Sequence, residues 1–339
     1  MTHGWVTGRR VMVKERVMHR LLGALLGVLV LMQAPPVVAQ GYPERPARIV
    51  VPFSPGGVAD GSARIIANHL SQTWGKPFLV ENRPGAAAII GIMAVVKAPA
   101  DGYTLLYAPT NIATNASAYA DLQYDAERDL VPVALGALTP GIIVVHPSFP
   151  ANTLGELIAL AKSKPGEFTY SSTGVATYPH LAIEQLQQQA GVQFTHVPYK
   201  GYAPALTAVL ANEVTMLASD VPGALPYLKA GKLRALAATG SRRQAVLPGV
   251  ATVAEQGLAD YEAVGWLGIM APAGTPRDIV LKLNAEINRG LTKADVASRF
   301  AATGVEVAPG SPEDFGAYIQ RSRARWSGVI RKGGIKGGE

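Results

Sequence analysis

Two short loops carry the residues in this sequence that are best suited to binding an anion. The first loop, residues 54–57, reads Ser-Pro-Gly-Gly, and the second loop, residues 173–177, reads Thr-Gly-Val-Ala-Thr. Each loop follows an apolar run and precedes residues at helical spacing. A helix N-terminus presents unpaired backbone N–H groups and a partial positive charge, so an anion can bind there without a basic side chain. Most glycine-containing loops of this kind only connect elements, so either loop taken alone could be a connector.

Side chains that could perform other chemistry are few. The chain has no cysteine, which excludes disulfides, a thiolate nucleophile and cysteine-ligated metal sites. Gly-x-Ser-x-Gly, Gly-x-x-x-x-Gly-Lys-Ser/Thr, Gly-x-Gly-x-x-Gly and His-Glu-x-x-His motifs are also missing from the sequence. The four histidines after residue 39 are scattered, with no pair at i, i+4 to hold a metal ion. The sequence therefore predicts no metal, no cofactor and no enzyme of a common class.

Three polar residues near the loops still allow alternatives. His180 stands just after the second loop, where it could make a structural hydrogen bond or contact a ligand. Ser172 with His180 is the one nearby pair of nucleophile and base, which keeps an exported hydrolase open although no acid partner is evident. Asp220 ends a predicted strand and precedes Pro222, a place where carboxylates usually cap turns. His69 is expected to be a packing or surface residue.

The net charge does not indicate binding to nucleic acid. The formal charge of the 339 residues is +7, but residues 1–39 hold five basic residues and one acidic residue, and so account for four of these charges. Much of the remainder lies in the last nine residues, which are rich in glycine and lysine. The body of the chain is close to neutral, so the sequence predicts no nucleic-acid partner.

The first 39 residues have the order of a secretory signal. A basic stretch ends at Arg20, an apolar run covers residues 21–32, and the small residue Ala39 closes the segment after two prolines. Twelve apolar residues fall short of the ~20 that a membrane-spanning helix needs. Translation could also begin at Met12. We expect cleavage after Ala39 and export to the periplasm, and the absence of cysteine is compatible with that oxidising compartment.

The rest of the sequence alternates strand, loop and helix. Helical spacing is expected over residues 63–74, 89–97 and 180–189, and helices start at the capping box Thr153-x-x-Glu156, at Thr275-Pro276 and at Ser311-Pro312. This order predicts an α/β protein with parallel sheet and helices on both faces. About 300 residues favour two such domains. The expected strands are residues 48–53, 78–80, 104–107, 142–145, 168–171, 194–197, 214–218, 233–238 and 267–271.

A series of motifs in residues 42–330 resembles the extracytoplasmic solute receptors of tripartite tricarboxylate transporters, the Bug family. The resemblance covers nearly all of this range. Many motifs in the same order are far more specific than a single short motif. The motifs are Tyr42-Pro43-x-x-Pro46, Ile49-Val50-Val51-Pro52-Phe53-x-Pro55-Gly56-Gly57-x-x-Asp60-x-x-Ala63-Arg64, Val80-Glu81-Asn82-Arg83-Pro84-Gly85-Ala86, Ala100-Asp101-Gly102-Tyr103-Thr104-Leu105-Leu106, His196-Val197-Pro198-Tyr199-Lys200-Gly201, Ala230-Gly231-Lys232-Leu233-Arg234-Ala235-Leu236-Ala237 and Ala271-Pro272-Ala273-Gly274-Thr275-Pro276.

The resemblance implies a two-lobed periplasmic-binding-protein fold of the second structural type, with the lobes joined by two hinge strands. The hinges are expected near residues 141–145 and 265–271. Lobe 1 would be discontinuous, residues 42–140 plus 265–339, and lobe 2 would be residues 141–264. A small carboxylate would bind between the lobes of a monomer. The closed receptor would then present it to the large and small membrane subunits of a transporter.

The resemblance also implies a set of ligand-binding residues. The loop Pro55-Gly56-Gly57 matches the family loop whose backbone receives a carboxylate, partly through water. Asp60 matches an aspartate that is better explained as a cap or as an ion-pair partner of Arg64 than as a direct contact. Asp220 matches an aspartate that reads the far end of the ligand. The complete expected set is Phe53, Pro55, Gly56, Gly57, Asp60, Ala86, Thr110, Ser172, Gly174, Thr177, His180 and Asp220.

The sequence departs from the family pattern in both loop regions. Val58-Ala59 stand where the family commonly has Ser-Thr, Ala87-Ala88-Ile89 replace Gly-Gly-Asn, and Val175-Ala176 replace Asn-Gly, while Tyr178-Pro179 replace small polar residues. Each change removes a hydroxyl, an amide or a permissive glycine. We therefore expect a drier, narrower pocket and a ligand with one carboxylate and an apolar or aromatic body, rather than citrate.

Transport and sensing remain alternatives at this stage. A receptor that feeds a membrane kinase would close over its ligand by the same movement as a transport receptor. The sequence does not separate the two uses.

Overall fold

The computed structural model describes residues 41–302 and 304–337. The predicted signal segment, residues 1–39, lies outside this described part. Eight of the ten described strands form one continuous path in the order β2-β1-β3-β9-β4-β7-β5-β6, and β8 and β10 lie off this path and pair with β4. Within the part of the chain described here, no helix combines the length and the apolarity needed to cross a membrane.

Sheet A contains the first strands of the chain, the first part of β4 and the whole of β9. β1 pairs in parallel with β2 and β3, β9 pairs antiparallel with β3 and with residues 130–140 of β4, and β10 pairs antiparallel with β4. Buried β-branched and leucine side chains explain β1 and β3, because a strand covered on both faces is apolar throughout. The bounds are β1 (Ala47–Val51), β2 (Phe78–Asn82), β3 (Thr104–Pro109), β4 (Leu130–Val145), β9 (Val264–Pro272) and β10 (Glu306–Val307).

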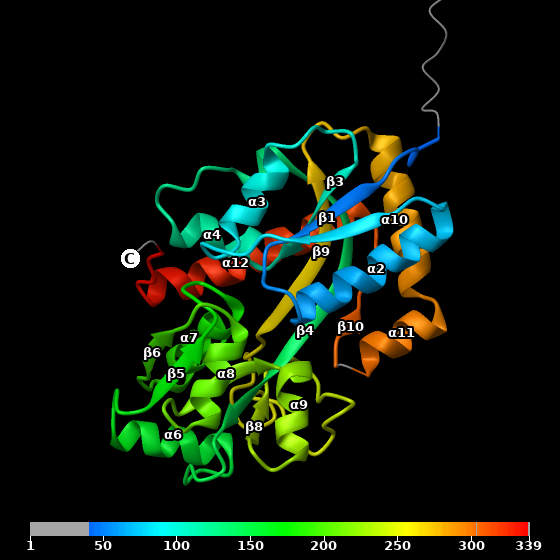
Figure 1. Ribbon diagram of the computed structural model, residues 1–339. Helices are drawn as coiled ribbons and strands as arrows, with labels where there is room; N and C mark the ends of the chain where they lie inside the picture. Colours follow the sequence, from blue (N-terminus) through cyan, green and yellow to red (C-terminus); the bar gives the residue numbers. More distant parts are fainter. Residues whose placement is uncertain (1–40, 303, 338–339) are drawn as a thin grey trace, which may run out of the picture. The chain divides into compact units, whose positions relative to one another are not determined.

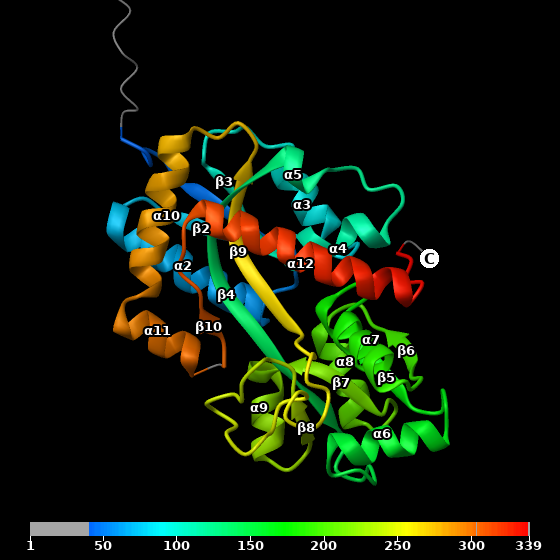
Figure 2. The same cartoon turned by 180° about the vertical axis from the view of Figure 1, so that it is seen from behind.

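Sheet B contains the remaining strands and the end of β4. β5 pairs in parallel with β6 and β7, whereas residues 141–145 of β4 pair antiparallel with β7 and β8. β4 therefore runs through both sheets, as Figures 1 and 2 show. The bounds are β5 (Thr169–Ser172), β6 (Thr195–Pro198), β7 (Met216–Asp220) and β8 (Arg234–Ala238).

The expectation of parallel sheet is correct for the pairs of β1 with β2 and β3 and of β5 with β6 and β7, and wrong for the pairs that β4 and β9 make, which are antiparallel. Only residues 142–145 of the sixteen-residue β4 were expected as a strand, because Pro132, Gly136 and Pro140 break the apolar pattern. The ladder between β4 and β9 absorbs these residues with two register shifts. Bulges of this kind let a strand bend and keep pairing.

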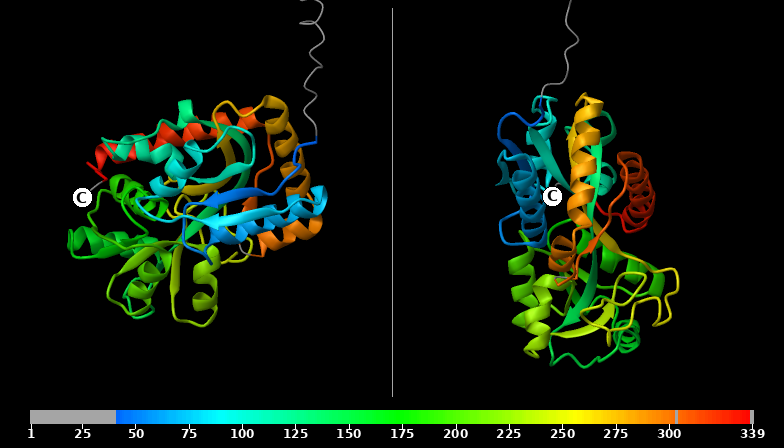
Figure 3. Two further views of the ribbon diagram at one scale, coloured as in Figure 1. Left: turned by 45° about the horizontal axis from the view of Figure 1, so that its top comes forward. Right: turned by 90° about the vertical axis from the view of Figure 1, so that its right-hand side faces the viewer.

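Eleven helices are described around the sheets. α2 and α10 pack together, α12 lies along β4, and α4 lies against α12. Figure 3 shows α12 and α2 on opposite sides of the strands. The bounds are α2 (Val58–Trp74), α3 (Ile89–Val96), α4 (Asn111–Ala118), α5 (Ala126–Asp129), α6 (Leu154–Ser163), α7 (Tyr178–Ala190), α8 (Tyr202–Leu210), α9 (Val221–Lys229), α10 (Arg277–Leu291), α11 (Ala294–Ala301) and α12 (Pro312–Lys332).

Helix α12 joins two hydrophobic cores. Phe315 and Ile319, near its start, pack with Trp266 and other residues beside sheet A, whereas Trp326 and Ile330, near its end, pack in the core beside sheet B. Its N-terminus has the expected cap at Ser311, with a reciprocal bond to Asp314. The last helix is therefore shared between both halves of the structure.

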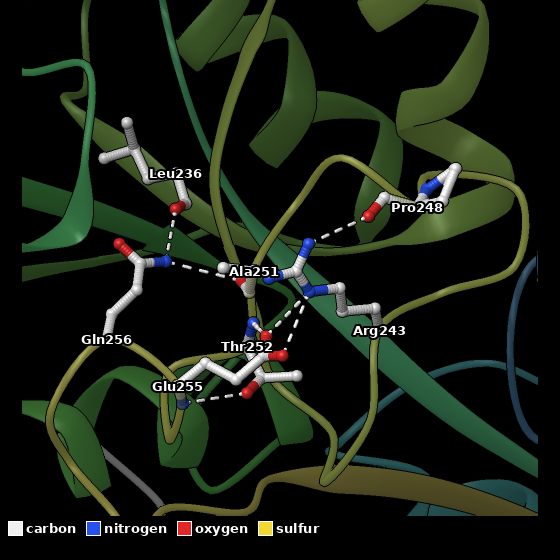
Figure 4. Close-up of polar contacts among 7 residues, drawn as sticks. All are labelled: Leu236, Arg243, Pro248, Ala251, Thr252, Glu255 and Gln256. Atoms are coloured by element: carbon white, nitrogen blue, oxygen red, sulfur yellow. Dashed lines mark hydrogen bonds and ion pairs between the residues drawn. The ribbon is translucent and has the colours of Figure 1, made fainter.

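The long connection from β8 to β9 is fixed by side chains rather than by regular structure. Figure 4 shows the Arg243 guanidinium against the Glu255 carboxylate, at 2.9 and 3.0 Å, and its bond to the Pro248 carbonyl at 3.2 Å. The same carboxylate accepts a bond from the Thr252 N–H, and the Gln256 amide donates to a carbonyl of β8. These contacts hold the chain before β9 in one conformation.

Candidate functional site

The first loop ends in an open helix N-terminus. The first-turn N–H groups of a helix have no partner within the helix. In α2 the N-cap is Gly57, and no side chain caps these groups. Gly56 has a φ of +87°, a conformation that favours glycine. A Cβ added at either glycine would have no heavy atom within 4 Å. This loop can therefore offer backbone donors to an anion, as expected from its sequence.

Asp60 ties the first loop to its surroundings. Its carboxylate accepts bonds from the Gly56 N–H at 3.1 Å and the Asn82 amide at 3.0 Å, and it forms an ion pair with Arg64 at 3.0 Å. Burial acts to raise the pKa of Asp60, but the bonds from Arg64, Gly56 and Asn82 outweigh it and the pKa lies below its usual value. The ion pair expected from the four-residue spacing is present. Asn82 also donates to the Phe53 carbonyl at 3.0 Å, so the Phe53 backbone belongs to the same frame.

A third loop, residues 85–88, carries three alanines in the left-handed conformation, and we call it the alanine loop. The φ angles are 46° for Ala86, 48° for Ala87 and 73° for Ala88. Such a conformation costs an L-residue about 1–2 kcal/mol. The family pattern has glycine at the positions of Ala87 and Ala88, and glycine adopts this backbone conformation without strain. The alanine loop is therefore held under strain next to the ends of β1 and β2.

The second loop is organised by Ser172. The Ser172 hydroxyl donates to the Gly174 carbonyl at 3.0 Å, accepts from the Gly174 N–H at 3.1 Å and lies 2.6 Å from Nε2 of His196. The Thr177 hydroxyl donates to the same carbonyl at 2.7 Å. Thr177 is the N-cap of α7 and does not cap that helix with its side chain, so this N-terminus is uncapped like that of α2, although Pro179 in its first turn has no N–H.

Two stacked histidines support the second loop from inside. The rings of His180 and His196 lie 3.8 Å apart, with Tyr170 against His196 at 4.9 Å. Nδ1 of His180 accepts a bond from the Ala176 N–H at 3.1 Å, so the ring hydrogen is on Nε2. Burial, together with the charge of His196, lowers the pKa of His180 to about 3, and burial lowers the pKa of His196 to about 4. Both rings are neutral at pH 7 and carry no charge for an anion.

This arrangement gives the hydrolase alternative no support. Ser172 is fully buried, and its hydroxyl bonds to His196 rather than to His180. His180 makes the structural hydrogen bond that its position suggested. A nucleophile needs access to a substrate and a base that can take its proton.

The Thr110 hydroxyl forms a hydrogen bond with the backbone of the neighbouring strand, β9. It accepts a bond from the Trp266 N–H of β9 at 2.9 Å and is 5% exposed. Thr110 is also the N-cap residue of α4, without a side-chain cap. The residue stands at the end of β3, as expected, but its side chain joins β3 to β9.

Asp220 caps α9 and is half-buried. Its Oδ1 accepts from the Gly223 N–H at 2.7 Å, which is the turn-capping contact that its position predicted. Burial raises the pKa of Asp220 to about 6, although bonds from Gly223 and Tyr202 oppose the shift. In the sheet Asp220 lies opposite Gly141 of β4.

Tyr178 connects the second loop to the place where Asp220 stands. Its hydroxyl lies 2.7 Å from the Thr239 hydroxyl, which in turn accepts from the Gly141 N–H at 2.8 Å. A Cβ at Gly141 would lie 2.4 Å from the Tyr178 oxygen, so only glycine fits there. The start of α7 and the end of β7 are therefore brought together beside β4.

Two residues that the sequence analysis missed connect the alanine loop with the second loop. Thr114 of α4 donates its hydroxyl to the Ala176 carbonyl at 3.1 Å, and the Asn115 amide donates to the Ala87 carbonyl at 3.1 Å. Both side chains are fully buried. A signal was present in the polar residues at positions 110, 111, 114 and 115 after a buried strand, but α4 itself was not expected. Within the described residues no group of histidine and carboxylate side chains could hold a metal ion.

Comparisons with known proteins agree with this geometry. Residues 62–335 match the model of the tripartite tricarboxylate transporter family receptor. The chain is 36% identical over 323 residues to the protein BugT of Bordetella pertussis, covering 94% of this chain and 99% of BugT. It is 38% identical over 290 residues to a UPF0065 protein of Pseudomonas sp. strain P51, covering 85% of this chain and 86% of that protein.

Solved structures show the same fold. A Rhodopseudomonas palustris protein solved with adipate has a TM-score of 0.83 and 35% identity, covering 87% of this chain and 99% of that one. MatC of R. palustris, solved with bound malate, has a TM-score of 0.78 and 31% identity, covering 85% of this chain and all of that one. The periplasmic binding protein BugD has a TM-score of 0.80 and 31% identity, with 87% and 99% of the two chains covered. This chain therefore has the two-lobed periplasmic-binding-protein fold and belongs to the tripartite tricarboxylate transporter receptor family.

Proposed function

We propose that this protein is a periplasmic solute receptor that binds a small carboxylate between its two lobes and delivers it to the large and small membrane subunits of a tripartite transporter. The observation that carries the proposal is the pair of open helix N-termini, α2 after β1 of sheet A and α7 after β5 of sheet B. One carboxylate held by both would favour closure, because a ligand shifts the equilibrium toward the state that it binds better.

The division into lobes follows the two sheets. Lobe 1 consists of residues 42–140 plus 265–339 and lobe 2 of residues 141–264, and the hinges lie where β4 passes from sheet A to sheet B and where the chain enters β9. The end of α12 packs in the core beside sheet B, so we assign Trp326 and the residues after it to contacts with lobe 2. The chain is exported, is cleaved after Ala39 and acts as a monomer without a cofactor.

The ligand has one carboxylate and an apolar or aromatic body. Ala86 and Ala87 bring methyl groups and no polar side chain to the alanine loop, Ala88 and Ala176 are buried, and His180 and His196 are neutral. Asp220 would repel a second carboxylate at neutral pH and tolerate it below its pKa of about 6. Two structural neighbours were solved with adipate and malate, which makes these acids the natural reference ligands.

The test is a binding screen on residues 40–339, unfolded and refolded beforehand to remove any bound ligand. Benzoate, short monocarboxylates, adipate, malate and citrate are compared by thermal shift and calorimetry. A ligand at 100 times its Kd stabilises the fold by about 2.7 kcal/mol, which moves Tm by several degrees. We expect monocarboxylates to bind at pH 7.5. Micromolar citrate binding without any monocarboxylate binding would contradict the proposed ligand class. If none of the acids bound, the proposed receptor function would be contradicted.

Asp220→Ala sharpens the same screen. We expect this variant to change which acids bind more than it changes Tm, because the carboxylate would no longer repel a second acidic group. A large fall in Tm with unchanged selectivity would show that Asp220 only caps α9.

A further inference from the structure

Helix α4 is the element that touches loops of both halves. Its adjacent residues Thr114 and Asn115 point to opposite partners: Thr114 donates to the Ala176 carbonyl beside sheet B, and Asn115 donates to the Ala87 carbonyl beside sheet A. Both donor side chains are completely buried, and the bond to Ala176 is buried while the bond to Ala87 is partly buried.

The acceptors of these two bonds are strained residues. Ala87 has a φ of 48° and Ala176 a φ of 58°, the left-handed region that alanine rarely occupies. Such residues persist only where the surrounding structure determines their conformation, and they concentrate at functional sites. In each loop the carbonyl of a strained alanine is held by α4.

Helix α4 is itself well anchored. Ile112 and Ala113 pack in the core beside sheet A, and Ala118 packs in the core beside sheet B. The Asn115 amide also donates to the Tyr124 hydroxyl at 3.0 Å, and the Gly337 N–H donates to the Ala118 carbonyl at 2.7 Å. The helix therefore has the rigidity that is needed to transmit a position from one loop to the other.

We propose that Thr114 and Asn115 are positioning residues that hold the second loop and the alanine loop in the conformation that binds ligand, and that they set the spacing between the loops across the two lobes. This proposal rests on the proposed receptor function for its effect on affinity, but not for its effect on the loops. Neither residue needs to touch the ligand.

The first experiment measures hydrogen exchange in the ligand-free chain. Thr114→Val removes one hydroxyl at constant shape, and we expect the amides of residues 174–177 to exchange at least tenfold faster. Asn115→Leu should do the same to residues 86–88. Thr114→Ser keeps the hydroxyl and should behave as wild type.

Two controls separate positioning from general loosening. Thr275→Val removes another buried hydroxyl-to-carbonyl bond, to Pro272 at 2.7 Å, far along the chain from both loops. Tyr124→Phe removes the other acceptor of the Asn115 amide N–H group and leaves its bond to Ala87. Neither control should speed exchange in the loops. Unchanged exchange in Thr114→Val and Asn115→Leu, or an equal rise in the controls, would overturn the proposal.

The second experiment uses adipate and benzoate as probes and follows association and dissociation rates. Thr114→Val and Asn115→Leu should each raise Kd about tenfold, mainly through faster dissociation, while Thr114→Ser does not. Weaker binding with unchanged loop exchange would mean direct contact with the ligand and would also overturn the proposal. If neither probe binds the wild type, the receptor function fails for these acids, and the exchange result still decides the role of the two residues.

Discussion

The loops beside sheet A and the loop beside sheet B are held by different kinds of interaction. The first loop is exposed and is tied down by a charged group, the Asp60 carboxylate with Arg64 and the Gly56 N–H. The second loop rests on buried, neutral groups, Ser172 with the stacked rings of His180 and His196. The Asp60 carboxylate is only 5% exposed, so its charge depends on the half-exposed Arg64 and on the bonds from Gly56 and Asn82. The second loop places no charged group at its support and therefore needs no such compensation.

The difference predicts the largest effect at Gly174. Its φ of +129° is closed to proline, and its N–H donates to the Ser172 hydroxyl. Gly174→Pro should lower the free energy of unfolding by about 3 kcal/mol and weaken ligand binding at least tenfold. Gly57 has a φ of −86°, and a Cβ added there would have no heavy atom within 4 Å. Gly57→Ala in the first loop should therefore change the free energy of unfolding little. Calorimetry and chemical denaturation of both variants check the contrast, and unchanged affinity in Gly174→Pro would remove the second loop from the site.

The second prediction concerns pH. The folded-state pKa values of about 3 for His180 and about 4 for His196 lie below the usual 6.5, so between about pH 4 and 6.5 the unfolded chain binds more protons. The free energy of unfolding should therefore rise with pH across this window, by on the order of 5 kcal/mol for the two rings together. In His196→Gln the rise should be clearly smaller, measured by urea denaturation at several pH values. If the free energy of unfolding rose with pH equally steeply in His196→Gln, the two histidines would not be the cause of the pH dependence.

The third prediction applies to the charged side of the comparison. The pKa of Asp60 is lowered in the fold, so its contribution is present above its unfolded pKa of 3.8 and is lost as the pH falls through the lower folded value. Asp60→Asn should cost about 1–2 kcal/mol at pH 7, since hydrogen bonds to a charged group are lost but Arg64 is half-exposed. The cost should shrink below about pH 4, as denaturation of both proteins at pH 7 and pH 3 would show. A cost that stays constant with pH would indicate a packing effect instead.

The smallest expected effect distinguishes the strained alanines. Ala86 is exposed with a φ of 46°, so Ala86→Gly should relieve strain and raise the free energy of unfolding by about 0.5 kcal/mol after the larger chain entropy of glycine is subtracted. Ala176, with a φ of 58°, is fully buried in the core beside sheet B. Ala176→Gly should therefore show no gain, because the relief is offset by the lost methyl group. Equal gains at both positions would mean that burial does not separate the two loops.

The family, the order of most strands and helices, and the two loops at the ends of β1 and β5 were predictable from the sequence. Apolar runs of β-branched residues, helical spacing and the caps at Thr153 and Ser311 are local patterns, and local patterns are what a sequence displays. The ion pair of Asp60 with Arg64 was predictable for the same reason, because its partners stand one helical turn apart.

Only the tertiary structure decided the rest. The pairing of Ser172 with His196, 24 residues away, and the bonds of Thr114 and Asn115 to loops 62 and 28 residues away have no local signal. The same is true of β4, because its prolines and glycines interrupt the apolar pattern of a strand and the segment is extended only through its pairing with β9. Ser172, Thr114 and Asn115 are buried, so their polar groups must find partners inside the fold, and which partners those are depends on the packing of the whole chain.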